Sequence, residues 1–137
     1  MPKHAGGCLC GGVRYEFNAE PAMTAVCHCS HCQKTSGSAF SVILGVPADS
    51  VHVTKSETLA TFKDMGTSGK HVLRKFCNAC GAPVISDAAA FPGILFIKAG
   101  TLDDTSSIRP CLHIWTASAQ PWVAIDETAK KFPGNPG

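Results

Sequence analysis

The stretch "CHCSHCQKTSG", residues 27–37, holds three cysteines and two histidines in its first six positions. The cysteines are Cys27, Cys29 and Cys32. Because their spacing joins a C-x-C to a C-x-x-C, one short segment can present three thiolates to a single metal ion. A short helix is expected after the motif, with Ser30 as its N-cap and Gly37 at its end. The third cysteine would then lie near the helix N-terminus, where the dipole and free N–H groups favour a thiolate.

Four further cysteines form two pairs. Cys8 and Cys10 lie in "CLCGG", which we expect on an extended strand, where alternate side chains share a face. Cys77 and Cys80 lie in "CNACG", a zinc knuckle in which backbone N–H groups donate to sulfur and Gly81 takes a left-handed conformation. Each pair supplies half of a tetrahedron. Together they predict one closed Cys₄ zinc site, and such a site is structural.

The trio has no obvious fourth cysteine, since the two pairs complete each other and Cys111 stands alone. A three-thiolate zinc centre keeps one position for water or substrate, which is typical of a catalytic site. Two alternatives stay open at this point. His28 or His31 could supply the fourth ligand and close a second structural site, or the sulfurs could hold an iron–sulfur cluster, although their spacing matches neither familiar ferredoxin pattern. Cys111 is interpreted as a buried, inert thiol.

The composition suits a single metal-binding domain. Of 137 residues, 45% are hydrophobic and 16% are charged, which is enough for one modest core. The segment "MPKHAGG" lacks the apolar stretch of a secretion signal, and no run is apolar enough to cross a membrane. We therefore expect a cytoplasmic protein, whose reduced thiols favour metal over disulfide bonds or buried free thiols. A net charge of +2 with scattered Lys and Arg predicts no nucleic-acid partner.

Short β-like runs, separated by glycine and proline, recur along the chain. They are residues 11–17, 39–46, 51–54, 71–76, 94–99 and 111–116. We expect one mainly β domain over 1–137, with its core at about 5–126 and a frayed tail at 127–137.

Four segments, taken in order, resemble the glutathione-dependent formaldehyde-activating (GFA) enzyme family. They are "GGCLCGGVRYEF", "CHCSHCQKTSGSAF", "RKFCNACGAPV" and "RPCLHIWTASAQPW". They are similar to the family's G-x-C-x-C-G-x-V-R-Y, C-H-C-x-x-C-(Q/R)-K-x-x-G-x-x-F, R-x-F-C-x-x-C-G and H-(I/V)-(W/F)-x-x-S-x-x-P-W segments. The resemblance covers nearly the whole chain and implies a β-tent of twisted antiparallel sheets with one short helix, stapled by zinc. It implies a structural zinc on Cys8, Cys10, Cys77 and Cys80 and a catalytic zinc on Cys27, Cys29 and Cys32.

The family's namesake reaction condenses glutathione with formaldehyde to S-hydroxymethylglutathione, formally a carbon–sulfur lyase reaction in reverse. The resemblance therefore implies a lyase with two zinc ions per chain that acts on a thiol–aldehyde adduct. The alternative is a non-catalytic zinc-binding module that binds a protein partner, because related β-tent domains include binding proteins.

Glutathione carries carboxylates, so its pocket should offer cations, amide donors and aromatic walls. Arg14 and Trp115 are candidates for such a pocket. His113 is expected to be a packed or hydrogen-bonded histidine, with acid–base catalysis as the alternative. For each substrate candidate, an exposed surface position or ordinary core packing is the competing interpretation. The predicted substrate-binding residues are Gln33, Lys34, Phe40 and Trp122.

Overall fold

The computed structural model describes residues 3–66 and 69–136. In those ranges no helix is long and apolar enough to span a bilayer. The elements, in chain order, are β1 (His4–Gly7), β2 (Val13–Phe17), β3 (Met23–Cys27), α1 (Ser30–Ser36), β4 (Ser41–Pro47), η1 (Ala48–Ser50), β5 (Val51–Ser56), β6 (Leu59–Met65), β7 (His71–Cys77), β8 (Pro83–Ala88), β9 (Ile94–Lys98), η2 (Ala99–Thr101), β10 (Leu112–Ile114), η3 (Thr116–Ser118) and β11 (Lys130–Lys131), where η marks a 3₁₀ turn.

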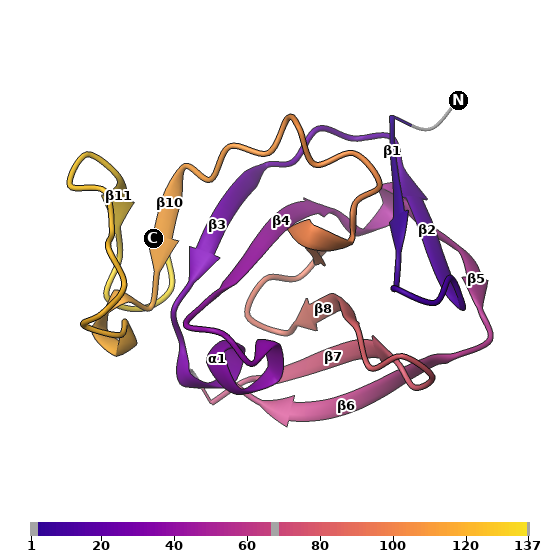
Figure 1. Ribbon diagram of the computed structural model, residues 1–137, viewed down its shortest axis with the longest axis horizontal. Helices are drawn as coiled ribbons and strands as arrows, with labels where there is room; N and C mark the ends of the chain where they lie inside the picture. Colours follow the sequence, from indigo (N-terminus) through magenta and orange to yellow (C-terminus); the bar gives the residue numbers. More distant parts are fainter. Residues whose placement is uncertain (1–2, 67–68, 137) are drawn as a thin grey trace.

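In the part of the chain that the structure describes, the strands form two sheets. A small antiparallel sheet has the order β1-β2-β5, and a large sheet has the order β11-β10-β3-β4-β9-β8-β7-β6. The large sheet curves from β3 and β4 round to β7 and β6, with α1 near the β6 end (Figure 1). Over the described residues, this confirms the expected small, mainly β fold with one helix. The structure adds two parallel pairings, of β10 with β3 and of β10 with β11.

Two apolar clusters lie on opposite faces of the large sheet. Along β4, Leu44 and Val46 join the larger cluster, while Ile43 joins the smaller one. This follows from the alternation of side chains along a strand. The larger cluster includes Cys8 and Cys77, and the smaller one includes all three cysteines of the 27–37 motif. The sheet therefore separates the two predicted metal sites.

Six of the observed strands overlap the expected runs, and five do not. The strands absent from the expectation are β1, β3, β6, β8 and β11. Their sequences lack a clear alternation: β8 begins with proline, and β3 is a short run that ends in a cysteine. They become strands through pairing with neighbours, because strand preference depends strongly on context.

The predicted C-terminal boundary of the helix is confirmed, whereas the predicted N-cap is wrong. Gly37 ends α1 in the left-handed region, at φ 64°, as expected. The N-cap, however, is Cys29 and not Ser30, because the Cys29 sulfur accepts the N–H of Cys32 at 3.2 Å. The sulfur thus occupies the place that a hydroxyl or carboxylate usually takes at an N-cap.

The C-terminal segment is the part for which the sequence predicts a frayed tail. Its described part, up to residue 136, contains β11, which pairs with β10. The N–H of Phe132 donates to the carbonyl of His113 at 2.9 Å, and the N–H of Trp115 donates to Gly134 at 3.0 Å. These bonds hold the segment against the edge of the large sheet.

Candidate metal centres and the adjoining cavity

The first cluster joins two turns that are far apart in the sequence. The Cys10 sulfur lies 3.7 Å from that of Cys8 and 3.6 Å from that of Cys77. With Cys80, all four sulfurs lie within 4.8 Å of one another. Sulfurs about 2.3 Å from a tetrahedral zinc ion are about 3.8 Å apart. The four thiols therefore fit zinc with little rearrangement.

Backbone N–H groups donate hydrogen bonds to the sulfurs of this cluster. The N–H of Val13 donates to the Cys8 sulfur at 3.2 Å, and the N–H groups of Ala79 and Cys80 lie 3.4 Å from the Cys77 sulfur. The hydrogen bond with Thr58, together with the N–H groups of Cys80 and Ala79, lowers the pKa of Cys77 to about 6. Such bonds stabilise thiolates, which are the form that binds metal.

The local conformation differs from the expected extended strand. Cys8 and Cys10 lie in the turn between β1 and β2, where the N–H of Gly11 donates to the carbonyl of Cys8 at 3.3 Å. The turn brings their sulfurs together by bending the chain, and it leaves Cys10 exposed while Cys8 is buried. Gly81 takes the left-handed conformation expected for the knuckle, at φ 79°.

The second cluster comes from one segment. Cys27 is the last residue of β3, Cys29 caps α1, and Cys32 lies in its first turn. The three sulfurs lie within 4.8 Å of one another, and in the described ranges no histidine or carboxylate joins this group. Three buried thiols at this separation suit a soft metal such as zinc.

Both neighbouring histidines have other partners. His28 is fully buried, and its Nε2 lies 2.8 Å from Nδ1 of His113. Burial lowers the pKa of His28 and of His113, so the pair is neutral at neutral pH. His31 Nδ1 lies 2.7 Å from the carboxylate of Asp64. These contacts confirm that His113 is hydrogen-bonded, and they occupy one ring nitrogen of each candidate fourth ligand.

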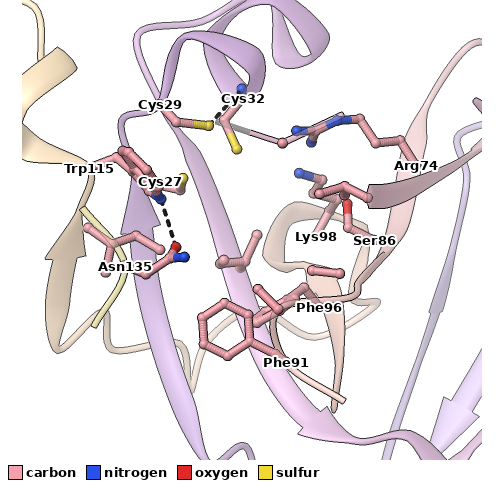
Figure 2. A pocket seen from close by; sticks show the side chains of 16 residues that line it. Cys27, Cys29, Cys32, Arg74, Ser86, Phe91, Phe96, Lys98, Trp115 and Asn135 are labelled. Carbon is pink, nitrogen blue, oxygen red and sulfur yellow. Dashed lines mark hydrogen bonds between the residues drawn. The ribbon is translucent and has the colours of Figure 1, made fainter. Parts of the chain in front are cut away.

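A cavity of about 90 Å³ adjoins the three-thiol cluster. Figure 2 shows the sulfurs on one side of this cavity, with Arg74 and Lys98 across from Trp115. The apolar part of the lining includes Ile43, Phe91, Phe96, Ile114 and Trp115.

The two cations of the cavity are nearly buried. Lys98 is 8% exposed and its Nζ donates to the Ser41 hydroxyl at 2.8 Å. Burial lowers the pKa of Lys98, although the neighbouring thiolates oppose this effect. Burial also lowers the pKa of Arg74, but its bond to Asp64 and the charge of Cys32 raise it more.

These cations favour ionised sulfur in the cluster. Hydrogen bonds with Cys27 and Cys29 lower the pKa of Cys32 most, and the charges of Lys98 and Arg74 lower it as well. Burial acts in the opposite direction and does not prevail. Lys98 and Arg74 therefore favour the thiolate form of Cys32, whereas hydrogen bonds with Cys29 and Cys32 raise the pKa of Cys27.

The sequence-predicted substrate residues are not part of the lining of this cavity. Gln33 donates through Nε2 to the carbonyls of His28, at 2.8 Å, and Ser118, at 3.0 Å. Lys34 is exposed, Trp122 is 72% exposed, and Phe40 packs its ring 5.7 Å from that of His28. None of the four predicted residues lines this cavity or a second, neighbouring cavity of about 370 Å³ that shares Arg74, Ser86 and Lys98 with it.

Of the weaker candidates, only Trp115 lines the cavity. Its backbone is left-handed at φ 57°, and its indole N–H donates to Asn135 at 2.9 Å. Arg14 instead pairs with Asp103, at 2.9 Å. Cys111 is exposed, so the expectation of a buried thiol was wrong. The residue directly precedes β10, where the pairing of β10 with β3 begins.

The residues that sequence reasoning missed are Arg74, Ser86 and Lys98. Arg74 lies directly opposite Ser86, Ser86 lies opposite Phe96, and Lys98 is two residues further along β9. Two signals were available. Arg74 is the arginine of the segment "RKFCNACGAPV", which resembles the family's R-x-F-C-x-x-C-G, and a lysine at the end of the apolar run "ILFIK" is in a position where burial is unusual and needs a partner.

These features define a class: a small, mainly β protein with two cysteine clusters suited to metal ions, one of them beside a cavity. Residues 3–118 match the family described as glutathione-dependent formaldehyde-activating enzyme, and the chain belongs to this family.

Curated relatives support the assignment. Two fungal proteins, from Penicillium rubens and Talaromyces marneffei, are 32% and 37% identical over 114 and 113 residues. Each alignment covers 77% of this chain and 58% of the relative, so the chain spans less than two thirds of their length. Both carry the name "Putative glutathione-dependent formaldehyde-activating enzyme".

A crystal structure of a Rhodobacter sphaeroides protein has the same fold. It matches with a TM-score of 0.61 over 93% of this chain and 98% of that chain. The sequence identity is 19%, so the likeness concerns the fold alone.

Proposed function

We propose that this chain is a zinc-dependent carbon–sulfur lyase of the synthase type, which acts on a thiol–aldehyde adduct such as S-hydroxymethylglutathione. The observation that carries the proposal is a three-thiol cluster beside a cavity, with no fourth protein donor grouped with it in the described ranges. Such a centre keeps one position for an exogenous ligand. The structural zinc would be held by Cys8, Cys10, Cys77 and Cys80, and the catalytic zinc by Cys27, Cys29 and Cys32.

The reaction needs no oxidant or reductant. The sulfur of the thiol forms a bond to the carbonyl carbon, the π pair moves to the oxygen, and the thiol proton ends on that oxygen. The reverse reaction breaks the same carbon–sulfur bond. Zinc, when bound, lowers the pKa of a thiol and orients it. Because three thiolates leave zinc a weak Lewis acid, positioning is expected to contribute much of the rate.

The protein's own residues supply the surroundings. The apolar lining, which includes Phe91 and Phe96, limits water near the cluster, so charges act more strongly there. Lys98 and Arg74 favour the thiolate form of Cys32. All eight cysteines are free, and metal ligation requires reduced thiols. This supports a cytoplasmic location as part of the proposal.

The test is exchange NMR on the zinc-loaded chain with glutathione and formaldehyde. We expect adduct formation and breakdown to exceed the spontaneous rate, and the Cys29→Ser chain to show the spontaneous rate alone. A wild-type chain with two zinc ions and no acceleration would remove this activity.

The alternative is a non-catalytic zinc-binding module that binds a protein partner. It draws support from Phe62 and Met65, which are 56% and 49% exposed on the edge strand β6, since exposed apolar side chains suit protein contacts. A second zinc whose fourth ligand is a protein side chain, measured by X-ray absorption, would favour this alternative.

A further inference from the structure

Three hydrogen-bond donors meet beside the sulfurs with few partners of their own. Ser86 is 6% exposed, and among residues 3–66 and 69–136 its buried hydroxyl has no hydrogen-bond partner. Lys98 donates to the Ser41 hydroxyl, and in the described ranges it forms no ion pair. The Nε–H of Arg74 donates to the carboxylate of Asp64. A buried polar group without a partner is costly, so it calls for an explanation.

The sheet register places these donors on one face. Arg74 is directly opposite Ser86 across β7 and β8, and Ser86 is directly opposite Phe96 across β8 and β9. Lys98 follows Phe96 by two residues, so it points to the same side. Directly opposed and diagonal neighbours on one face lie within reach of long side chains.

Two cavities meet at these residues. Arg74, Ser86 and Lys98 line both the cavity beside the sulfurs and a second cavity of about 370 Å³. The second cavity also contains Lys75, and neither lining includes an aspartate or glutamate. Small-molecule sites usually measure about 300–1,000 Å³, so the first cavity alone is too small for a peptide-sized thiol.

We propose that Arg74, Ser86 and Lys98 form a carboxylate subsite that selects acidic thiols as substrates. The substrate sulfur reaches the three-thiol cluster through the smaller cavity, and its carboxylate is held where the two cavities meet. Lysine and arginine only donate hydrogen bonds and the serine hydroxyl can donate one, which matches the acceptor-only chemistry of a carboxylate. The chemical reaction of the bound thiol rests on the proposed function, whereas the preference for binding acidic thiols does not.

A competing explanation is that the cations only balance the thiolates. The charges of Arg74 and Lys98 offset those of Asp64 and of a zinc-loaded three-thiol cluster, so charge balance alone requires no acidic substrate. That explanation, however, leaves the Ser86 hydroxyl without an acceptor. It also gives no role to Lys75 in the second cavity.

The experiment measures binding to the zinc-loaded chain by tryptophan fluorescence. The chain has two tryptophans, and Trp115 lines the cavity while Trp122 is exposed. A Trp122→Phe background therefore leaves one reporter at the site. The probes are 3-mercaptopropionate and its neutral counterpart 3-mercaptopropanamide, which differ in the carboxylate alone.

Three variants in this background separate the explanations. Lys98→Met removes the charge and keeps the length of the side chain, and Ser86→Ala removes the unpartnered hydroxyl. Lys55→Met, on an exposed position of β5, is the matched control for loss of one charge. Zinc per chain is measured in every variant.

We expect the acid to bind at least about 10-fold more tightly than the amide, as for a hydrogen-bonded charge. Lys98→Met should weaken the acid about 10-fold or more and Ser86→Ala about 3-fold or more, with the amide and the Lys55→Met control unchanged. Equal binding of acid and amide to the Trp122→Phe chain would overturn the subsite, as would loss of zinc from Lys98→Met with both thiols weakened alike. Acid selectivity without any acceleration of the glutathione–formaldehyde reaction would uphold the subsite and reject the proposed function.

Discussion

The two cysteine clusters differ in solvent exposure and in room for a ligand, and the two properties do not go together. The four-thiol cluster lies near the surface, with Cys10 exposed, yet it groups four sulfurs within 4.8 Å of one another, enough donors for a closed tetrahedral site. The three-thiol cluster is buried, with each cysteine at most 7% exposed, yet it adjoins a cavity and gathers no fourth protein donor in the described ranges. Solvent exposure of a thiol therefore does not indicate which site is open to a ligand. The number of donors and the space beside them do.

The clusters also differ in what they connect. The four thiols join the β1–β2 turn to the end of β7 and the turn that follows, 67 residues apart in sequence at Cys10 and Cys77. The three thiols come from six consecutive positions and connect little beyond β3 and α1. Loss of the first cluster should therefore affect folding, and loss of the second should affect chemistry.

The largest effect is expected from Cys77→Ser. Structural zinc sites in small domains contribute roughly 10–16 kcal/mol of apparent binding free energy, which is as large as the whole stability of a typical domain, about 5–15 kcal/mol. The variant should lose one zinc and its cooperative thermal transition, as measured by elemental analysis and circular dichroism. A melting curve like that of the wild type would show that this cluster does not hold the fold together.

Cys29→Ser should leave the fold intact and abolish turnover. Serine is a good N-cap, so it can still accept the N–H of Cys32 that the sulfur accepts now. We expect one zinc per chain, a normal circular dichroism spectrum, and the spontaneous rate with glutathione and formaldehyde. Full activity in this variant would contradict a catalytic role for the three-thiol cluster.

Asp64→Asn tests how much the contacts of this carboxylate, next to the three-thiol cluster, stabilise the fold. The carboxylate accepts from Arg74 at 2.8 Å and contacts His31 of α1 at 2.7 Å. Burial raises the pKa of Asp64, but the hydrogen bonds from Arg74 and His31 lower it more, so the group is ionised at neutral pH. Its loss leaves Arg74 without a carboxylate, and we expect about 2–3 kcal/mol less stability in urea unfolding.

The matched control for that variant is Asp49→Asn, an exposed aspartate of η1. Its substitution should change the free energy of unfolding by less than about 0.5 kcal/mol. If both variants behave alike, the contact between α1 and β6 does not stabilise the fold.

The smallest effect is expected from Cys111→Ser. This thiol is exposed and lies outside both groups of sulfurs. The variant should keep two zinc ions per chain and a free energy of unfolding within about 0.5 kcal/mol of the wild type. Loss of a zinc ion would show that Cys111 belongs to a metal site after all.

The division of the cysteines was predictable because ligand spacing is a local property. A C-x-x-C turn or a C-x-C followed by a helix brings sulfurs together with few constraints from the rest of the fold. The glycines that end α1 and form the knuckle, Gly37 and Gly81, were predictable for the same reason, since a positive φ favours glycine. Strand β3, by contrast, was missed because its pairing with β4 and β10 creates it.

The amino-acid sequence by itself determines which thiols can act together, how many each site has, and the family to which the chain belongs. Only the tertiary structure decides what faces the three-thiol cluster. Arg74, Ser86 and Lys98 come from three strands and follow no common spacing in the chain. Cross-strand register alone brings them to one face, because it depends on pairing between strands and not on the residues that flank each site.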